Sequence, residues 1–226
     1  MARHPTRQYT VAMCQTLVQL AQLDIRAYVQ HVVGSSNLPR ARNELAAGFL
    51  VSDYTDLLFI DDDMGWRPAD VVRLLASDKP LIAGVGPRKR ALSDNDARKW
   101  CVRFLADGVI NQDRMGAVEV EAAGTGFMLI SRSVLSTMIE AHPEWKRSGW
   151  DNMPEDARRW YHRFFHFDSD HADEPGEDYS FCWAWRALGG QVWVDPSISL
   201  VHVGEHEFGG DFTAMFIAET KQCPHS

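Results

Sequence analysis

The chain has 226 residues, of which 45% are hydrophobic and 24% charged, and its formal net charge is −8. This acidic balance argues against a general nucleic-acid binder, which is normally basic, although it leaves room for a local basic patch. No apolar run approaches the roughly 18 residues of a membrane span, and the N-terminus lacks the apolar core of a secretory signal. The four scattered cysteines form no CxxC pair, so we expect reduced thiols in a cytoplasmic protein.

The first third of the chain alternates between short apolar runs and helical patterns. Strands are expected at 9–12, 25–33, 57–60 and 81–85, and helices at 13–23, from 39 to 50 and from 67 to 75. Such alternation implies right-handed crossovers and a parallel sheet.

The remainder of the chain is less regular. Residues 87–116 are polar and basic and are expected to form a mobile loop or an irregular hairpin, and residues 142–176 are expected to be loops with a short helix near 155–164. Further strands are expected at 118–123, 127–130, 191–194 and 198–203, and further helices at 132–141, 177–188 and in the tail from 211. Because no repeat or linker interrupts the pattern, we expect a single α/β domain over 1–226.

The stretch around which this pattern is organised is the apolar run 57–60, followed directly by Asp61, Asp62 and Asp63. An apolar run without a polar face is typical of a buried strand in a parallel sheet, and open α/β sheets bind ligands at the carboxyl ends of their strands. If the strand persisted, Asp61 and Asp63 would point to one side and Asp62 to the other. The two carboxylates would then repel each other unless Mg²⁺ or Mn²⁺, with a phosphate co-ligand, lay between them. A solvated acidic turn is the simpler alternative.

Two further pairs of residues carry candidate chemistry. Glu177 and Asp178 follow Gly176 at an expected helix start, where they serve either as helix-capping acids or as a general base. His202 alternates with two valines on the last strand and is a candidate Mn²⁺ ligand, with an ordinary half-buried histidine as the alternative. His206 in the following loop competes for the same role.

Two backbone features suit a phosphate-containing ligand. Arg42 and Asn43 lie near an expected helix N-terminus, where a diphosphate is favoured, although exposed helix arginines are equally common. Gly124-Thr125-Gly126 precedes a strand and lets a ligand approach the backbone closely.

Taken in order, these segments resemble one family. The motifs are the Arg-Asn helix at 42–43, Phe-Ile-Asp-Asp-Asp-Met at 59–64, Gly-Thr-Gly-Phe-Met-Leu-Ile at 124–130, Gly-Glu-Asp-Tyr-Ser-Phe-Cys at 176–182 and Leu-Val-His-Val-Gly at 200–204. Their order resembles GT-A glycosyltransferases, especially the compact, family-2-like enzymes of phages and large viruses. The resemblance implies a Rossmann-like, mostly parallel central sheet with helices on both faces. It also implies nucleotide-sugar binding within about 1–86, and acceptor binding and catalysis within about 87–210.

The resemblance implies a role for each matched acidic or imidazole group. Asp61, Asp62 and Asp63 would form the DxD motif, in which Asp63 chelates the Mn²⁺ or Mg²⁺ on the donor diphosphate and Asp61 contacts the ribose or the metal. His202 would be the third protein ligand. Asp178 would be the base that deprotonates the acceptor hydroxyl, with Glu177 beside it.

The donor site implied by the resemblance draws on several elements. The first strands would hold the nucleotide base. Its other expected contacts are Arg42, Asn43, Asp61, Asp62, Lys89, Gly124, Thr125 and Gly126. Since the chain ends soon after the late histidine, segments 87–116 and 142–176 are expected to bind the acceptor.

The implied function is metal-dependent transfer of a sugar from a UDP-sugar to an acceptor hydroxyl, with inversion. The first acceptor hypothesis is a hydroxymethylated pyrimidine in phage DNA, modified in the host cytoplasm, and a glycan or protein acceptor is the alternative. Two other classes stay open: a non-catalytic nucleotide-sugar binding module, and a haloacid-dehalogenase-like phosphohydrolase with Asp61 as nucleophile. The phosphohydrolase resemblance would place the acidic motif on the first strand, whereas an α/β pattern precedes it here.

Overall fold

The computed structural model describes residues 4–32, 35, 37–90, 99–151, 153–168 and 175–222. The helices are α1 (Arg7–Gln22), α2 (Leu38–Val51), α3 (Pro68–Leu75), α4 (Arg132–Ala141), α5 (Glu155–Arg158), α6 (Glu177–Ala187) and α7 (Phe212–Gln222). The strands are β1 (Asp56–Ile60), β2 (Met64–Gly65), β3 (Leu81–Ala83), β4 (Val102–Arg103), β5 (Val118–Val120), β6 (Ala122–Ala123), β7 (Phe127–Ser131), β8 (Val192–Val194), β9 (Val201–Val203) and β10 (Glu207–Phe208). Short 3₁₀ turns lie at Ala106–Gly108 and Pro143–Trp145.

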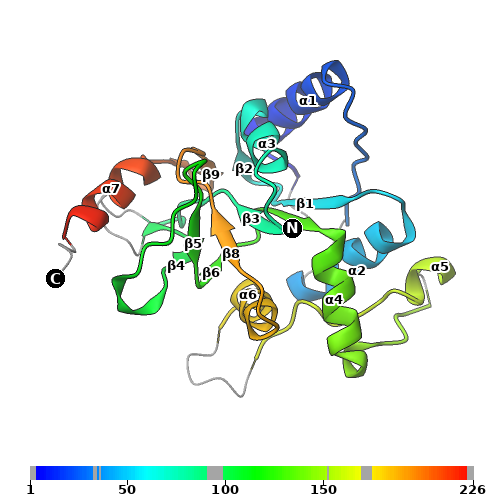
Figure 1. Cartoon of the computed structure of the whole chain (residues 1–226). Coiled ribbons are helices and arrows are strands. Elements are labelled where there is room, and N and C mark those ends of the chain that lie inside the picture. The colour runs from blue at the N-terminus through cyan, green and yellow to red at the C-terminus, as the bar shows by residue number, and fades with distance from the viewer. Residues whose placement is uncertain are drawn as a thin grey trace.

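The central sheet has five strands in the order β1-β7-β3-β8-β5 (Figure 1). β3 and β8 are parallel, whereas β7 runs antiparallel to both β1 and β3, and β5 runs antiparallel to β8. The prediction of a mostly parallel sheet is therefore wrong. The chain inserts β7 between β1 and β3, and an apolar run such as 127–130 has the same sequence signature in either direction.

Helices cover both faces of this sheet, as predicted. Side chains alternate along the strands, so that Leu81 and Ala83 join a core with α2, α4 and α6, while Ile82 joins a second core with α1 and α3. Figure 1 shows α1 and α3 side by side and α2, α4 and α6 away from them across the strands. The result is a mixed α/β fold with the sheet between two helical layers.

The N-terminal segment differs from the prediction. Residues 9–12 belong to α1, because Thr6 caps the helix by accepting a hydrogen bond from the backbone N–H of Tyr9 (3.2 Å). Ala12, Thr16 and Leu20 are buried at helical spacing, which makes α1 amphipathic from its first turn. Residues 25–32 are irregular and join no strand, and residues 33–34 lie outside the described part of the chain. Both N-terminal strand predictions are wrong.

A smaller three-stranded sheet, in the order β10-β9-β2, holds one end of the acidic stretch. Met64 faces His202 in its antiparallel ladder, and the N–H of Val203 donates to the carbonyl of Asp63 (2.8 Å). This ladder brings His202 next to the acidic stretch, from which it is far apart in sequence.

Segment 87–116 is a partly paired hairpin where it is described. Pro87 bridges Trp100, and β4 pairs with β6, while residues 91–98 lie outside the described part. The helix expected near 155–164 is the single turn α5, whereas α4 has its predicted bounds. Within the described ranges, no helix is long and apolar enough to cross a bilayer.

Candidate functional site

The three aspartates occupy a turn and not a continued strand. β1 ends at Ile60, and the N–H of Met64 donates to the carbonyl of Asp61 (3.0 Å), which closes the turn. The strand does not continue through the aspartates, so the condition under which Asp61 and Asp63 would share one side is not met, and their carboxylates have different partners. Asp62 is exposed, and its carbonyl accepts from the N–H of Thr6 (2.9 Å).

Asp63 lies between an imidazole and an ammonium group. Its Oδ1 is 3.2 Å from Nε2 of His202, and its Oδ2 accepts from Nζ of Lys89. Although burial opposes the shift, these hydrogen bonds and charges lower the pKa of Asp63 to about 2. Asp63 is thus a carboxylate that this site keeps ionised.

The tautomer of His202 is set by the backbone. Its Nδ1 lies 2.8 Å from the carbonyl of Pro87, and because a carbonyl oxygen can only accept, Nδ1 must donate. Nε2 then faces Asp63: it donates to this carboxylate when the ring is protonated on both nitrogens, whereas in the neutral ring its lone pair is available to a metal ion, an arrangement that is common behind metal-ligating histidines. His206, the competing candidate, is exposed and packs on Phe208 with a ring separation of 4.3 Å.

Asp63 and His202 suit a hard divalent ion as neighbouring ligands. Two adjacent ligands of an octahedral ion with bonds of about 2.1 Å lie about 3 Å apart, close to the observed 3.2 Å. Asp61 does not complete the predicted triad, since it pairs with Arg42. No group of three or more His, Cys, Asp or Glu side chains gathers as a metal site within the described ranges. The rest of an ion's coordination would come from water and a diphosphate, as is usual for Mg²⁺.

Arg42 ties the acidic turn to the start of α6. Its guanidinium is buried, contacts the carboxylate of Glu177 and lies 3.5 Å from Oδ1 of Asp61. Arg42 was expected to border a nucleotide, but here it holds two carboxylates. Glu177 is correspondingly buried, which makes it a structural partner of Arg42.

Asp178 is the partly exposed member of its pair. Burial and the negative charge of Glu177 raise its pKa, while Arg42 opposes the rise. A carboxylate with a raised pKa is a stronger base, which is the property that a general base requires.

The turn at 124–126 packs closely against these acids. A Cβ atom on Gly126 would lie 3.0 Å from Oδ2 of Asp61, and one on Gly124 would lie 3.0 Å from Cβ of Cys101 and 3.7 Å from Oδ2 of Asp178. The two glycines therefore let the turn pass between the acids. Thr125 is 1% exposed, and its hydroxyl has no hydrogen-bond partner within the described part of the protein.

Asn43 has a structural contact in place of the predicted nucleotide contact. Its Nδ2 donates to the carbonyl of Phe165, and its Oδ1 accepts from the N–H of Phe165, both at 2.8 Å. This reciprocal pair uses the amide to hold segment 153–168 against α2. The prediction that Asn43 borders a nucleotide loses its support.

Two residues of this region were not singled out from the sequence. The pKa of the Cys101 thiol is raised to about 11, chiefly by burial; Arg88 opposes this rise, and the charges of Asp178 and Asp61 contribute to it. Cys101 and Arg88 therefore lie within electrostatic range of the candidate base. A lone cysteine and one arginine in a basic stretch carry no sequence signal for this placement.

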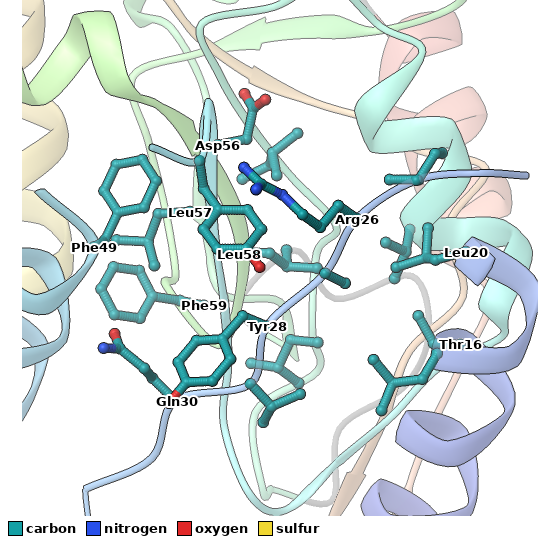
Figure 2. A pocket seen from close by; sticks show the side chains of 18 of the residues that line it. Thr16, Leu20, Arg26, Tyr28, Gln30, Phe49, Asp56, Leu57, Leu58 and Phe59 are labelled. Carbon is teal, nitrogen blue, oxygen red and sulfur yellow. The ribbon is translucent and has the colours of Figure 1, made fainter. Parts of the chain in front are cut away.

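A pocket of about 290 Å³ lies beside β1 (Figure 2). It runs along the outer edge of β1, with Leu57 to Phe59 on one wall, Thr16 and Leu20 of α1 opposite, and Tyr28 and Gln30 of the irregular segment between them. Tyr9 lines the pocket, and burial, together with the charge of Asp62, raises its pKa. Ile60, which directly precedes Asp61, also lines the pocket, whereas the three aspartates do not.

Comparisons with known proteins leave the site to be interpreted from its own geometry. No family model matches the chain, and no curated protein matches it. Among solved structures, the chain is similar to the crystal structure of A197 from STIV, with 16% sequence identity, coverage of 89% of this chain and 81% of that chain, and a TM-score of 0.46. This likeness is too slight to carry an argument about fold or function.

Proposed function

We propose that the protein is a metal-dependent glycosyltransferase with a GT-A-like site, which moves a sugar from a UDP-sugar to an acceptor hydroxyl with inversion. The observation that carries the proposal is the meeting of Asp63 with His202 and Lys89, together with the packing of Asp61 and Asp178 against the turn at 124–126. Acid, imidazole and base come from distant parts of the chain, and the fold gathers them at one end of β1.

Asp178 is proposed as the base. It accepts the proton of the acceptor hydroxyl as that oxygen attacks the sugar, and its raised pKa strengthens it for this step. Arg42 holds Glu177 in an ion pair, which leaves Asp178 as the partly exposed carboxylate of the two.

The donor is proposed to lie across the acidic turn. The pocket along β1 accepts the nucleotide base, and Lys89 and Arg88 supply positive charge for the diphosphate. Asp63 and His202 would hold the divalent ion, which, when bound, stabilises charge on the leaving diphosphate.

The acceptor proposal rests on basic and aromatic side chains. Arg88 and Arg103 are exposed on segment 87–116. The guanidinium of Arg40 lies over the ring of Trp150, 3.8 Å from its centroid, and the Trp150 ring also contacts the ring of Tyr161. We take a hydroxymethylated pyrimidine in DNA as the first acceptor to test, with glycan or protein acceptors next. A cytoplasmic location is proposed because Cys14, Cys101 and Cys182 are free thiols.

The first experiment tests donor binding. Calorimetry should show UDP binding that requires Mn²⁺ and that is lost in Asp63→Ala and weakened in His202→Ala, while His206→Ala, the matched control, binds normally. UDP binding that ignores Mn²⁺, or a larger effect of His206→Ala, would remove the metal assignment. Thermal stabilisation by beryllium fluoride with Mg²⁺, in place of UDP with Mn²⁺, would favour a phosphohydrolase that uses Asp61.

The second experiment identifies the transfer reaction. The protein is incubated with a panel of nucleotide sugars and with hydroxymethylated DNA, glycans or peptides, and products are read by mass spectrometry. A mass increase of one sugar on DNA supports the first acceptor hypothesis. Donor binding without any transfer would favour a non-catalytic binding module.

A further inference from the structure

Lys89 occupies a defined position against the acidic turn. Its Nζ contacts Oδ2 of Asp63, while Oδ1 of the same carboxylate faces His202. The side chains of Lys89 and Asp63 are 25% and 13% exposed, so the ion pair is partly accessible to solvent. Both oxygens of Asp63 are thus engaged by cationic or hydrogen-bonding partners.

The stem of Lys89 is held by packing as well as by charge. A Cβ atom on Gly204 would lie 3.3 Å from Cδ of Lys89, so the glycine leaves room for the lysine stem. Gly204 directly follows β9, the strand that carries His202. The lysine and the imidazole are therefore positioned by the same short segment.

We propose that Lys89 is a tethered cation that competes with a divalent ion for Asp63 and thereby couples metal binding to diphosphate binding. This inference rests on the proposed function. When Asp63 and His202 become metal ligands, Lys89 has to leave Oδ2, because an ammonium and a divalent cation repel each other at this range. A diphosphate bound next to the metal gives the displaced ammonium a new anionic partner.

The coupling has a signature that a merely structural lysine lacks. Coupling between two sites is reciprocal, so each of metal and diphosphate must strengthen the binding of the other. Lys89→Met removes the ammonium group that competes with the divalent ion for Asp63. The same group would pair with the diphosphate, so the variant also loses that contact. Mn²⁺ alone should therefore bind more tightly to the variant, whereas the gain from added diphosphate should shrink.

The experiment is a Mn²⁺ titration followed by electron paramagnetic resonance, using the full chain with and without pyrophosphate. Lys89→Met is expected to bind Mn²⁺ alone about tenfold more tightly than the natural protein, and its gain from pyrophosphate should fall by about tenfold. Lys89→Arg, which keeps the charge, should keep the coupling. Arg90→Met, which removes an exposed cation from the neighbouring position, should behave like the natural protein.

The outcomes separate this inference from the proposed function. If Mn²⁺ binds, responds to His202→Ala and is indifferent to Lys89→Met, the competition is refuted and the proposed function stands. If a folded protein, checked by its melting curve, binds no Mn²⁺ with or without pyrophosphate, both are refuted.

Discussion

Replacing Arg42 by Met tests whether one guanidinium stabilises the start of α6. The side chains of Arg42 and Glu177 are 6% and 9% exposed, so the substitution strands a buried carboxylate next to Asp178. Breaking a buried pair from one side costs about 3–5 kcal/mol. For a chain of this size each kcal/mol corresponds to about 2–4 °C, which predicts a fall in Tm of about 6–20 °C.

The assay is urea unfolding of Arg42→Met, Glu177→Gln and the double variant. The double variant should be more stable than the sum of the single losses predicts, with a coupling energy of about 1–3 kcal/mol, because it removes both charges together. Arg40→Met removes an exposed arginine from the same helix and should cost less than about 1 kcal/mol. A loss below about 1 kcal/mol in Arg42→Met, or strictly additive losses, would refute the role of Arg42 as the partner of a buried charge.

Three further outcomes are expected. Asp178→Asn should lower turnover by about 10²–10⁴-fold at unchanged donor affinity. The pKa of Asp178 is raised in the folded protein, so ionisation of this carboxyl group lowers the free energy of unfolding as pH rises, and the variant should be more stable to urea than the natural protein at neutral pH. Asp63 has a folded pKa of about 2 against 3.8 unfolded, so the stability it contributes is present above about pH 3.8 and is lost as pH falls toward 2, a dependence that unfolding curves of Asp63→Asn should lack. Arg132→Met removes hydrogen bonds to carbonyls at the C-terminal end of α2 and should cost about 2–3 kcal/mol in urea unfolding, with Arg132→Lys intermediate.

Local patterns predicted much of the secondary structure but not the direction of the strands. The helix at 132–141 and the strand at 127–130 follow from periodicity. Strand direction depends on where the chain returns to the sheet, and no local pattern records that β7 inserts between β1 and β3. The strand predicted at 9–12 failed because the capping by Thr6 outweighs the β-preference of a few residues.

The candidate site shows the same division. The sequence identified its candidate residues, but the contacts of these residues depend on how distant parts of the chain pack together. Asp61 and Asp63 diverge because the chain turns after Ile60, and the burial of Arg42 follows from α2 packing beside α6 in one core. Asn43 looked like a ligand contact because an amide near a helix N-terminus suits an anion, whereas its real partner is a backbone far along the chain.

The ladder between β2 and β9 has a consequence for biosynthesis. Met64 pairs with His202, and Asp63 receives the N–H of Val203, so these contacts cannot form until a ribosome has released the chain beyond that valine. During translation the acidic turn is made together with β1, long before β9, the strand that supplies these contacts. Nascent intermediates would therefore carry an acidic turn without its imidazole, and any sensitivity to Mn²⁺ should appear only after β9 has emerged.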